Sequence, residues 1–375
     1  MPKENSRNQV PVRAIISGGG TGGHIYPAIA IANELKERHA NTEILFVGAQ
    51  GKMEMEKVPK AGYPIEGLWI SGIQRSLSAD NLSFPFKLTS SLLKARRIIK
   101  KFKPNVAIGV GGFASGPLLY VASRMGVPSL IQEQNSYAGL TNKWLAKRVN
   151  TICVAYEGLE KYFPAEKLVH TGNPVRKDIL ALDVTAKRTA AFQHFGLDPA
   201  KQTILIVGGS LGARSINESI SKDLHKIVNA GAQVLWQTGK NSFEENPDNA
   251  GLLNHPLVKR TEFIYEMDLA YALADIIVSR AGALAVSEIC LVGAPAILVP
   301  FPFAAEDHQT KNVLALEEKN AAIHIKNSDA KSLLVDAALA LLQDTNRQQQ
   351  LAQNIRQLGK PKATEQIVDE VLKLI

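Results

Sequence analysis

One structural unit occurs three times in the sequence: a short apolar run, a glycine-rich turn and the start of a helical pattern. The unit reads IISGGGTGGH from residue 15, AIGVGGFASG from residue 107 and ILIVGGSLGA from residue 204. Short runs rich in Val and Ile that alternate with helical stretches indicate parallel strands joined by crossover helices. The chain is therefore predicted to be an α/β protein whose parallel sheets carry helices on both faces.

The strand–helix series divides into two. The first series is VRAIISGGG, TEILFVGA, VAIGVGGF, PSLIQEQ and TICVAY, with helices expected at 25–39 and 87–102; the second is QTILIVGGSLGA, AQVLWQTG, EFI, DIIVSRAG and PAILVPFP. A chain of 375 residues is too long for one ordinary core. We therefore predict two Rossmann-like domains facing across a deep cleft, residues 1–175 and 176–360, with a helix at 361–375 packed back on the first.

The first glycine loop matches the dinucleotide-binding pattern G-x-G-x-x-G at Gly18, Gly20 and Gly23. A dinucleotide site also needs an acidic residue at the end of the second strand, to bind the ribose. That strand ends in Gly48, Ala49 and Gln50 instead. The sequence also lacks a P-loop and any metal-ligand motif, so we expect no tightly bound cofactor, although a free divalent cation could assist.

The second half carries the better candidate for a nucleotide site. VGGSLGARS places Ser210 at a helix start, and SRAGALAVSEI places Glu288 one and a half turns into another helix. A carboxylate there can accept both hydroxyls of a ribose while the helix N-terminus faces a diphosphate. PFPFAAEDHQTKN adds Asp307, His308 and Gln309 after a strand, where α/β sheets place ligand-binding groups.

The positive charge lies in one half of the chain. Residues 1–175 contain 22 Lys and Arg against 12 Asp and Glu, and the remainder contains 21 against 23. An anionic membrane surface or a nucleic acid would match this excess, but no nucleic-acid-binding motif accompanies it. We predict a membrane patch of apolar and basic residues, the alternative being a solvated basic helix whose apolar residues belong to the core. The patch comprises Ile73, Leu77, Leu82, Phe84, Phe86, Lys87, Lys94, Arg96 and Arg97.

Seven segments together resemble the MurG family of bacterial N-acetylglucosaminyltransferases: GGGTGGHIYPAIAIA, GVGGFASGP, QEQNSYAGLTNKWLAKR, TGNPVR, VGGSLGARSIN, TEFIYEMDLAYALADIIVSRAGALAVSEI and PFPFAAEDHQTKNV. The resemblance implies the two-domain GT-B fold, UDP-N-acetylglucosamine as donor and lipid I as acceptor. It also implies a peripheral place on the cytoplasmic face of the inner membrane, with cell-wall synthesis and division proteins as possible partners. The polar N-terminus MPKENSRNQV, which no apolar segment follows, favours a cytoplasmic chain over a secreted one.

The same resemblance implies which residues contact the donor. Ile264 corresponds to the residue whose backbone reads uracil, and Gln309 to the glutamine that contacts the sugar hydroxyls, although PFPFAAEDHQTKN departs from some relatives in length and composition. The sugar and diphosphate would be met by Thr21, Gly22, Gly23, Asn135, Arg176 and Ser210. The nucleotide helix would comprise Ala283, Leu284, Ala285, Val286, Ser287 and Glu288, the last on the ribose.

Inverting sugar transfer needs a base for the acceptor hydroxyl and positive potential for the leaving diphosphate. His24 is the first candidate base, because a histidine titrates near neutral pH. Its alternative role is to cap the helix or bond a loop carbonyl. Glu133 is the second candidate, with a structural or acceptor-orienting role as its alternative. Another UDP-sugar-dependent GT-B transferase and a non-catalytic UDP-sugar-binding protein are the rival functions.

Overall fold

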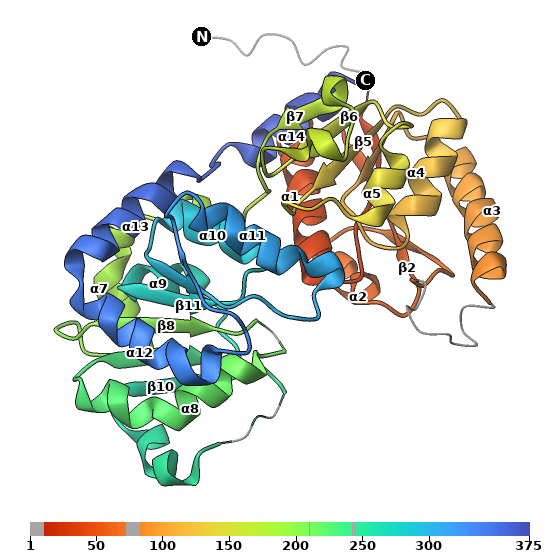
Figure 1. Ribbon diagram of the computed structural model, residues 1–375. Helices are drawn as coiled ribbons and strands as arrows, with labels where there is room; N and C mark the ends of the chain where they lie inside the picture. Colours follow the sequence, from red (N-terminus) through yellow and green to blue (C-terminus); the bar gives the residue numbers. More distant parts are fainter. Residues whose placement is uncertain (1–10, 73–82, 210, 242, 244) are drawn as a thin grey trace, which may run out of the picture. The chain divides into compact units, whose positions relative to one another are not determined.

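A computed structural model describes residues 11–72, 83–209, 211–241, 243 and 245–375. The chain divides into two compact units: unit 1 spans Met1–Pro174 together with Lys362–Ile375, and unit 2 spans Val175–Pro361. Each unit is built on one parallel sheet, so the predicted α/β class with two parallel-sheet domains is confirmed. Figure 1 labels most of the helices and several of the strands.

Unit 1 contains a seven-stranded sheet in the order β3-β2-β1-β4-β5-β6-β7. Every neighbouring pair is parallel, as the crossover helices require. The strands are β1 (Arg13–Ser17), β2 (Glu43–Ala49), β3 (Ile65–Leu68), β4 (Val106–Gly109), β5 (Ser129–Glu133), β6 (Thr151–Val154) and β7 (Leu168–His170). The helices are α1 (Gly22–Arg38), α2 (Glu54–Lys60), α3 (Phe84–Phe102), α4 (Ser115–Arg124), α5 (Leu140–Leu145), η2 (Leu159–Lys161), η3 (Ala165–Lys167) and α14 (Ala363–Leu372).

The central strands of unit 1, β1, β4 and β5, are buried on both faces. Along β1, Ile15 joins the core cluster beneath α3 and α4, whereas Ala14 and Ile16 join the cluster beneath α1 and α14. This division follows from the alternation of side chains along a strand. The helix α14 packs against α1, and Arg38 of α1 pairs with Asp369 of α14 at 2.5 Å. The C-terminal helix is thus part of the fold of unit 1.

Unit 2 contains a six-stranded parallel sheet in the order β10-β9-β8-β11-β12-β13. Its strands are β8 (Thr203–Val207), β9 (Gln233–Gln237), β10 (Val258–Thr261), β11 (Ile276–Ser279), β12 (Ala296–Leu298) and β13 (Ile323–His324). The prediction of a strand at EFI is wrong, because β10 ends at Thr261 and residues 262–264 form the loop after it. The helices are α6 (Lys177–Leu180), α7 (Val184–Phe195), α8 (Arg214–Asn229), η4 (Pro247–Asn254), α9 (Met267–Leu273), α10 (Ala283–Val292), η5 (Ala305–Asp307), α11 (His308–Glu317), α12 (Ala330–Gln343) and α13 (Thr345–Gln357).

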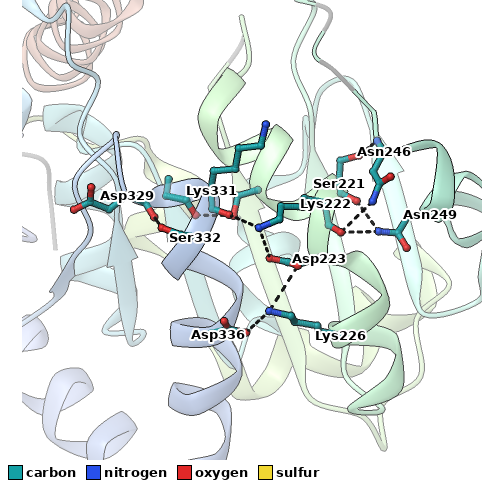
Figure 2. A network of polar contacts seen from close by, with 12 residues as sticks. Ser221, Lys222, Asp223, Lys226, Asn246, Asn249, Asp329, Lys331, Ser332 and Asp336 are labelled. Carbon is teal, nitrogen blue, oxygen red and sulfur yellow. Dashed lines mark hydrogen bonds and ion pairs between the residues drawn. The ribbon is translucent and has the colours of Figure 1, made fainter.

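The helix α8 is kinked at Asp223, whose φ of −111° and ψ of 19° interrupt the helical geometry. The buried Asn249 of η4 donates from its amide nitrogen to the carbonyl oxygens of Ser221 and Lys222, at 2.9 and 2.8 Å (Figure 2). Side-chain donors that replace the regular helical bonds are a common cause of kinks. Below the kink, Lys226 joins α8 to Asp336 of α12 at 2.8 Å. These side-chain contacts thus join the bent helix to η4 and to α12.

Candidate functional site

The loop between β1 and α1 lies at the carboxyl end of β1. Gly20 has a φ of 85°, a left-handed conformation that favours glycine. Thr21 is the N-cap residue of α1, in an extended conformation and without a side-chain capping bond. Thr21 and Gly23 are exposed and Gly22 is half-buried. The three predicted donor contacts therefore lie together at the first turn of a 17-residue helix, where backbone N–H groups are available to an anion.

His24 lies in the first turn of α1 and is half-buried. Its Nδ1 atom lies 2.9 Å from the carbonyl oxygen of Gly19. A carbonyl oxygen only accepts hydrogen bonds, so Nδ1 is the nitrogen that carries the proton. A Cβ atom at Gly111 would lie 2.8 Å from Nε2, so the glycine makes room for the ring. The loop-carbonyl contact therefore exists, and it assigns any role in proton transfer to Nε2.

A residue that sequence reasoning missed, Glu54, holds this loop. Glu54 is the first residue of α2 and is 1% exposed. Its carboxylate accepts from the backbone N–H of Gly20 at 2.8 Å and of Ala49 at 3.0 Å. Ala49 ends β2, the place where dinucleotide-binding domains put their ribose-binding acid. Glu54 thus brings a carboxylate to the end of β2 from five residues further along the chain. Both of its oxygens accept hydrogen bonds from backbone N–H groups of the protein.

Glu133 ends β5 and is 2% exposed. One carboxylate oxygen accepts from the backbone and side-chain nitrogens of Asn135, at 3.1 and 3.3 Å. The other accepts from Gly139 N and Asn142 Nδ2, both at 2.9 Å. The structure therefore brings the predicted pair Glu133 and Asn135 together. It also gives the carboxylate of Glu133 four intramolecular hydrogen bonds.

The predicted nucleotide helix, α10, begins after the N-cap residue Gly282. Ala283, Leu284 and Ala285 form its half-buried first turn. Val286 is 2% exposed and donates its N–H to Gly282, so its side chain packs in the core rather than facing a ligand. The Ser287 hydroxyl donates to the carbonyl oxygen of Ala283 at 2.9 Å. Small side chains in this first turn allow a close approach to the helix N-terminus.

Glu288 meets two partners from different helices. Its Oε1 lies 3.4 Å from Nε of Arg176, the N-cap residue of α6, and its Oε2 accepts from the Tyr271 hydroxyl of α9 at 2.9 Å. Burial raises the pKa of Glu288, against the opposing effects of the Arg176 charge and the Tyr271 hydrogen bond. Burial, reinforced by the negative charge of Glu288, raises the pKa of Tyr271 well above its ordinary value. The two predicted residues Arg176 and Glu288 are thus adjacent, and Tyr271 is an unpredicted third member of the group.

The backbone of Ile264 is also held by an unpredicted partner. Its N–H donates to Oε1 of Gln237, which ends β9 and is 2% exposed, at 2.9 Å. The side chain of Ile264 is 3% exposed and belongs to the core. Gln237 therefore fixes the backbone at the position predicted to read the base. Ser210, the predicted phosphate contact, lies outside the described residues.

Gln309 lies in the first turn of α11, and its amide oxygen accepts from the backbone N–H of Phe301 at 2.9 Å. Two residues without glycine's freedom precede it in left-handed conformations, Glu306 and Asp307, each with a φ of 55°. Such strain costs about 1–3 kcal/mol per residue and is typical of functional sites. Lys311 Nζ bonds the Glu306 carbonyl oxygen and Thr310 Oγ1 bonds Asp307, at 2.8 and 2.7 Å, which holds the strained turn.

Arg280 follows β11, and its hydrogen-bond partners among the described residues are neutral oxygens. One guanidinium nitrogen reaches the carbonyl oxygens of Val299 and Pro300 at 3.1 Å and Oδ1 of Asn327 at 2.8 Å, and a second reaches the Ser215 hydroxyl at 3.2 Å. Burial lowers the pKa of Arg280 to about 10. Arg280 thus joins the ends of β11 and β12 to the start of α8, a contact that sequence reasoning also missed.

The predicted membrane patch is partly described. Phe86 on α3 is 73% exposed, and Arg96 and Arg97 are exposed as well. Phe84 instead packs against the core, as the alternative interpretation of the patch had it. Lys94 donates to the Gly67 carbonyl oxygen, and Lys87 lies over the Trp69 ring at 5.9 Å. Ile73, Leu77 and Leu82 lie outside the described residues. The described part of the chain contains no helix long and apolar enough to cross a bilayer.

Comparison with known proteins identifies the family. Residues 14–154 match the glycosyltransferase family 28 N-terminal domain, and residues 203–367 match the corresponding C-terminal domain. A UDP-N-acetylglucosamine--N-acetylmuramyl-(pentapeptide) pyrophosphoryl-undecaprenol N-acetylglucosamine transferase of Cytophaga hutchinsonii is 58% identical over 98% of both chains. Its counterpart in Christiangramia forsetii is 55% identical over 97% of this chain and 98% of its own. The crystal structure of Acinetobacter baumannii MurG superposes with a TM-score of 0.76, at 29% identity over 97% of this chain and all of that one.

The chain belongs to the MurG family. It is therefore a glycosyltransferase with the GT-B fold, as the motifs had indicated. The MurG motifs contain Arg176, Glu288, Asn135 and its buried partner Glu133, but the contact of Tyr271 with Glu288 was not predicted. Two of the missed residues, Tyr271 and Arg280, carried a weak signal, because both lie inside the quoted motif TEFIYEMDLAYALADIIVSRAGALAVSEI. Glu54 lies outside those motifs and had no signal of its own.

Proposed function

We propose that this glycosyltransferase moves N-acetylglucosamine from UDP-N-acetylglucosamine to the C4 hydroxyl of the muramoyl sugar of lipid I, with inversion at the anomeric carbon. The products are lipid II, with a β-1,4 linkage, and UDP. The observation that carries the proposal is identity of more than half over nearly the whole length of relatives named for this transfer. The adjacent Arg176, Glu288 and Tyr271 support a nucleotide site in unit 2.

In this proposal unit 2 holds the donor. The Glu288 carboxylate, oriented by Tyr271, accepts the ribose hydroxyls, and the first turn of α10 faces the diphosphate. Arg176 now contacts Glu288 from 3.4 Å, and its Nε is buried without a hydrogen-bond partner of good geometry. A diphosphate gives this guanidinium the charge-assisted bonds that Glu288 does not fully supply. Gln309 contacts the sugar hydroxyls from the strained start of α11.

The chemical step forms one bond and breaks one. The C4 hydroxyl oxygen attacks the anomeric carbon of N-acetylglucosamine, and the bond from that carbon to the β-phosphate oxygen breaks. The bonding pair leaves on the diphosphate, so UDP departs as an anion, and the hydroxyl proton passes to Nε2 of His24. General-base catalysis of this kind contributes roughly 10²–10⁴-fold. We assign Glu133 to orientation of Asn135 rather than to proton transfer, because its four hydrogen bonds already occupy both oxygens.

The charge of the leaving diphosphate is met, in this proposal, by Arg176 and by the N-terminus of α10, without a resident metal ion. Helix N-termini and guanidinium groups are sufficient to bind a diphosphate. Initial rates should therefore change less than about twofold when a metal chelator replaces added magnesium, a small effect beside the several kcal/mol that a catalytic metal supplies. Loss of activity in the chelator would overturn this part of the proposal.

Lipid I carries its acceptor sugar at a membrane, so the enzyme has to work there. We assign this contact to the exposed Phe86 and Leu93 of α3 and to the neighbouring Arg96 and Arg97. Binding to vesicles with anionic lipid should weaken as salt rises, and Arg96→Gln with Arg97→Gln should reduce it further. Equal binding to neutral and anionic vesicles would contradict the assignment.

The test of the whole proposal is UDP release with and without a soluble lipid I analogue. Release that depends on the analogue, with formation of the disaccharide product, supports the transfer. His24→Gln should lower kcat by about 10²-fold or more with little change in the donor KM. Arg176→Ala should lower kcat/KM for the donor. Release of UDP at the same rate without acceptor would show a hydrolase instead.

A further inference from the structure

The peptide group between Gly19 and Gly20 is bonded on both sides by side chains. Its N–H, which belongs to Gly20, donates to Oε2 of Glu54 at 2.8 Å. Its carbonyl oxygen, which belongs to Gly19, lies 2.9 Å from Nδ1 of His24. A trans peptide places its N–H and its C=O on opposite edges, so this one amide joins the two side chains in a single line of hydrogen bonds.

The geometry around this amide leaves little room for it to turn. A Cβ atom at Gly19 would collide with the Glu54 carboxylate, and one at Gly48 would lie 2.5 Å from Glu54 Cγ. On the opposite side, a Cβ atom at Gly112 would lie 2.5 Å from the Gly19 carbonyl oxygen, and Gly19 N donates to Gly111 at 3.3 Å. The loop is therefore packed between Glu54 and the turn after β4, and glycine at these positions is what admits the carboxylate.

We infer that Glu54 is a positioning residue for His24, acting through the Gly19–Gly20 peptide. A carboxylate that accepts the amide N–H polarises the peptide and makes its carbonyl oxygen a better acceptor. The carbonyl oxygen then holds the proton on Nδ1 and leaves Nε2 as the basic nitrogen. Serine hydrolases achieve this with an aspartate bonded directly to the histidine, which fixes both the ring and its tautomer. Here one peptide group lies between the carboxylate and the ring.

This inference rests on the proposed function for its catalytic meaning, since His24 has to be the base for its tautomer to affect turnover. The link between Glu54 and the His24 ring is itself independent of catalysis. Nitrogen-15 NMR of histidine-labelled protein measures it directly, because the two ring nitrogens differ in shift according to which carries the proton. The His24 signals are assigned by their absence in His24→Gln.

The decisive variant is Glu54→Gln, which keeps the shape of the side chain. The N–H groups of Gly20 and Ala49 bond different oxygens of the Glu54 carboxylate, so an amide, which carries an NH2 group in place of one oxygen, cannot accept from both. We expect a substantial population of the Nε2–H tautomer of His24, and kcat reduced about 10–100-fold with the donor KM within twofold. The matched control is Glu56→Gln on the same helix, where an exposed carboxylate bonds Lys60 at 2.6 Å. The control should leave tautomer and kcat unchanged.

The outcomes separate the two proposals. A folded Glu54→Gln that loses activity while His24 keeps its Nδ1–H tautomer would overturn the inference and leave Glu54 a purely structural residue. If the His24 tautomer changes in Glu54→Gln, and both Glu54→Gln and His24→Gln keep full activity, the link between Glu54 and His24 is supported but His24 is not the base. If Glu54→Gln does not fold, Glu54→Asp repeats the test, because the shorter carboxylate cannot bond both N–H groups, and an unchanged tautomer there refutes the link.

Discussion

Replacement of Tyr271 by Phe is the sharpest test of the proposed nucleotide site. Tyr271 is 3% exposed, and its hydroxyl donates to Glu288 Oε2 at 2.9 Å. The variant therefore leaves a largely buried carboxylate oxygen without this partner. Hydrogen bonds to charged groups contribute about 1.5–3 kcal/mol. We therefore expect affinity for UDP to fall roughly 10–150-fold, provided that the donor needs Glu288 ionised and oriented as it now lies.

The pH dependence of UDP binding should also change in Tyr271→Phe, in a direction that the contacts of Glu288 determine. The groups that face Glu288 are Arg176, Asp178 and Tyr271; burial raises its pKa, while Arg176 and Tyr271 act to lower it. Loss of the Tyr271 hydroxyl removes one of the lowering effects, so the pKa of Glu288 rises further. As the solution is acidified, UDP binding should therefore begin to weaken at a higher pH in Tyr271→Phe than in the wild type.

Isothermal titration of UDP from about pH 5 to pH 8 measures both effects. The control is Tyr63→Phe in unit 1, where a buried hydroxyl donates to the neutral Asn33 amide oxygen at 2.6 Å. That variant should lose about 1 kcal/mol of unfolding free energy and no UDP affinity. Unchanged affinity and an unchanged acid limb in Tyr271→Phe would refute the assigned role of Glu288.

Three further predictions concern stability. The pKa of Glu288 is raised in the fold, so its contribution to stability is present below the ordinary Glu value and is lost as pH rises through the raised pKa. The unfolding free energy of Glu288→Gln should therefore increase relative to that of the wild type as pH rises above the ordinary Glu pKa of about 4.3, and a constant difference in denaturant titrations would contradict this. Arg280→Met should lower the unfolding free energy by about 2–3 kcal/mol and weaken UDP binding, because it removes the contact with the start of α8. Wild-type affinity for UDP would show that Arg280 contributes to stability alone. Asn249→Ala should cost about 1–3 kcal/mol at the α8 kink with kcat unchanged, and a lower kcat in the folded variant would refute a purely structural role.

The sequence predicted the buried strands well and the edge strands poorly, for one physical reason. Central strands such as β1 and β8 are buried on both faces and appear as continuous apolar runs. The edge strand β10 reads VKRT, with two exposed residues among its four, so no apolar run marks it and the prediction moved to EFI. The short β13 likewise contains only Ile323 and His324. Edge strands are visible only through their pairing with a neighbour.

The candidate site divides in a similar way. Residues that belong to a contiguous motif, such as Arg176 and Glu288, could be named because the resemblance covers the motif. Their partners could not, because the contact of Tyr271 with Glu288 depends on how α9 packs beside α10. The same holds for Gln237, whose side chain reaches a backbone 27 residues away. Which side chain holds which backbone group is decided by tertiary packing.

In the proposed mechanism, the same strand–glycine–helix motif has a different role in each unit. After β1, the backbone groups that could meet a phosphate are partly taken, because Gly20 N–H belongs to Glu54 and the Gly19 carbonyl oxygen to His24. After β11, α10 begins with Gly282 as its N-cap residue, and Glu288 on that helix faces Arg176 and Tyr271. A glycine pattern alone therefore cannot say whether a loop binds a nucleotide. The two loops differ in the hydrogen bonds of the nearest buried carboxylate. In unit 1, Glu54 accepts from the loop backbone, which in the proposal orients His24. In unit 2, Glu288 accepts from Tyr271 and lies beside Arg176, two side chains that a bound ligand can also contact.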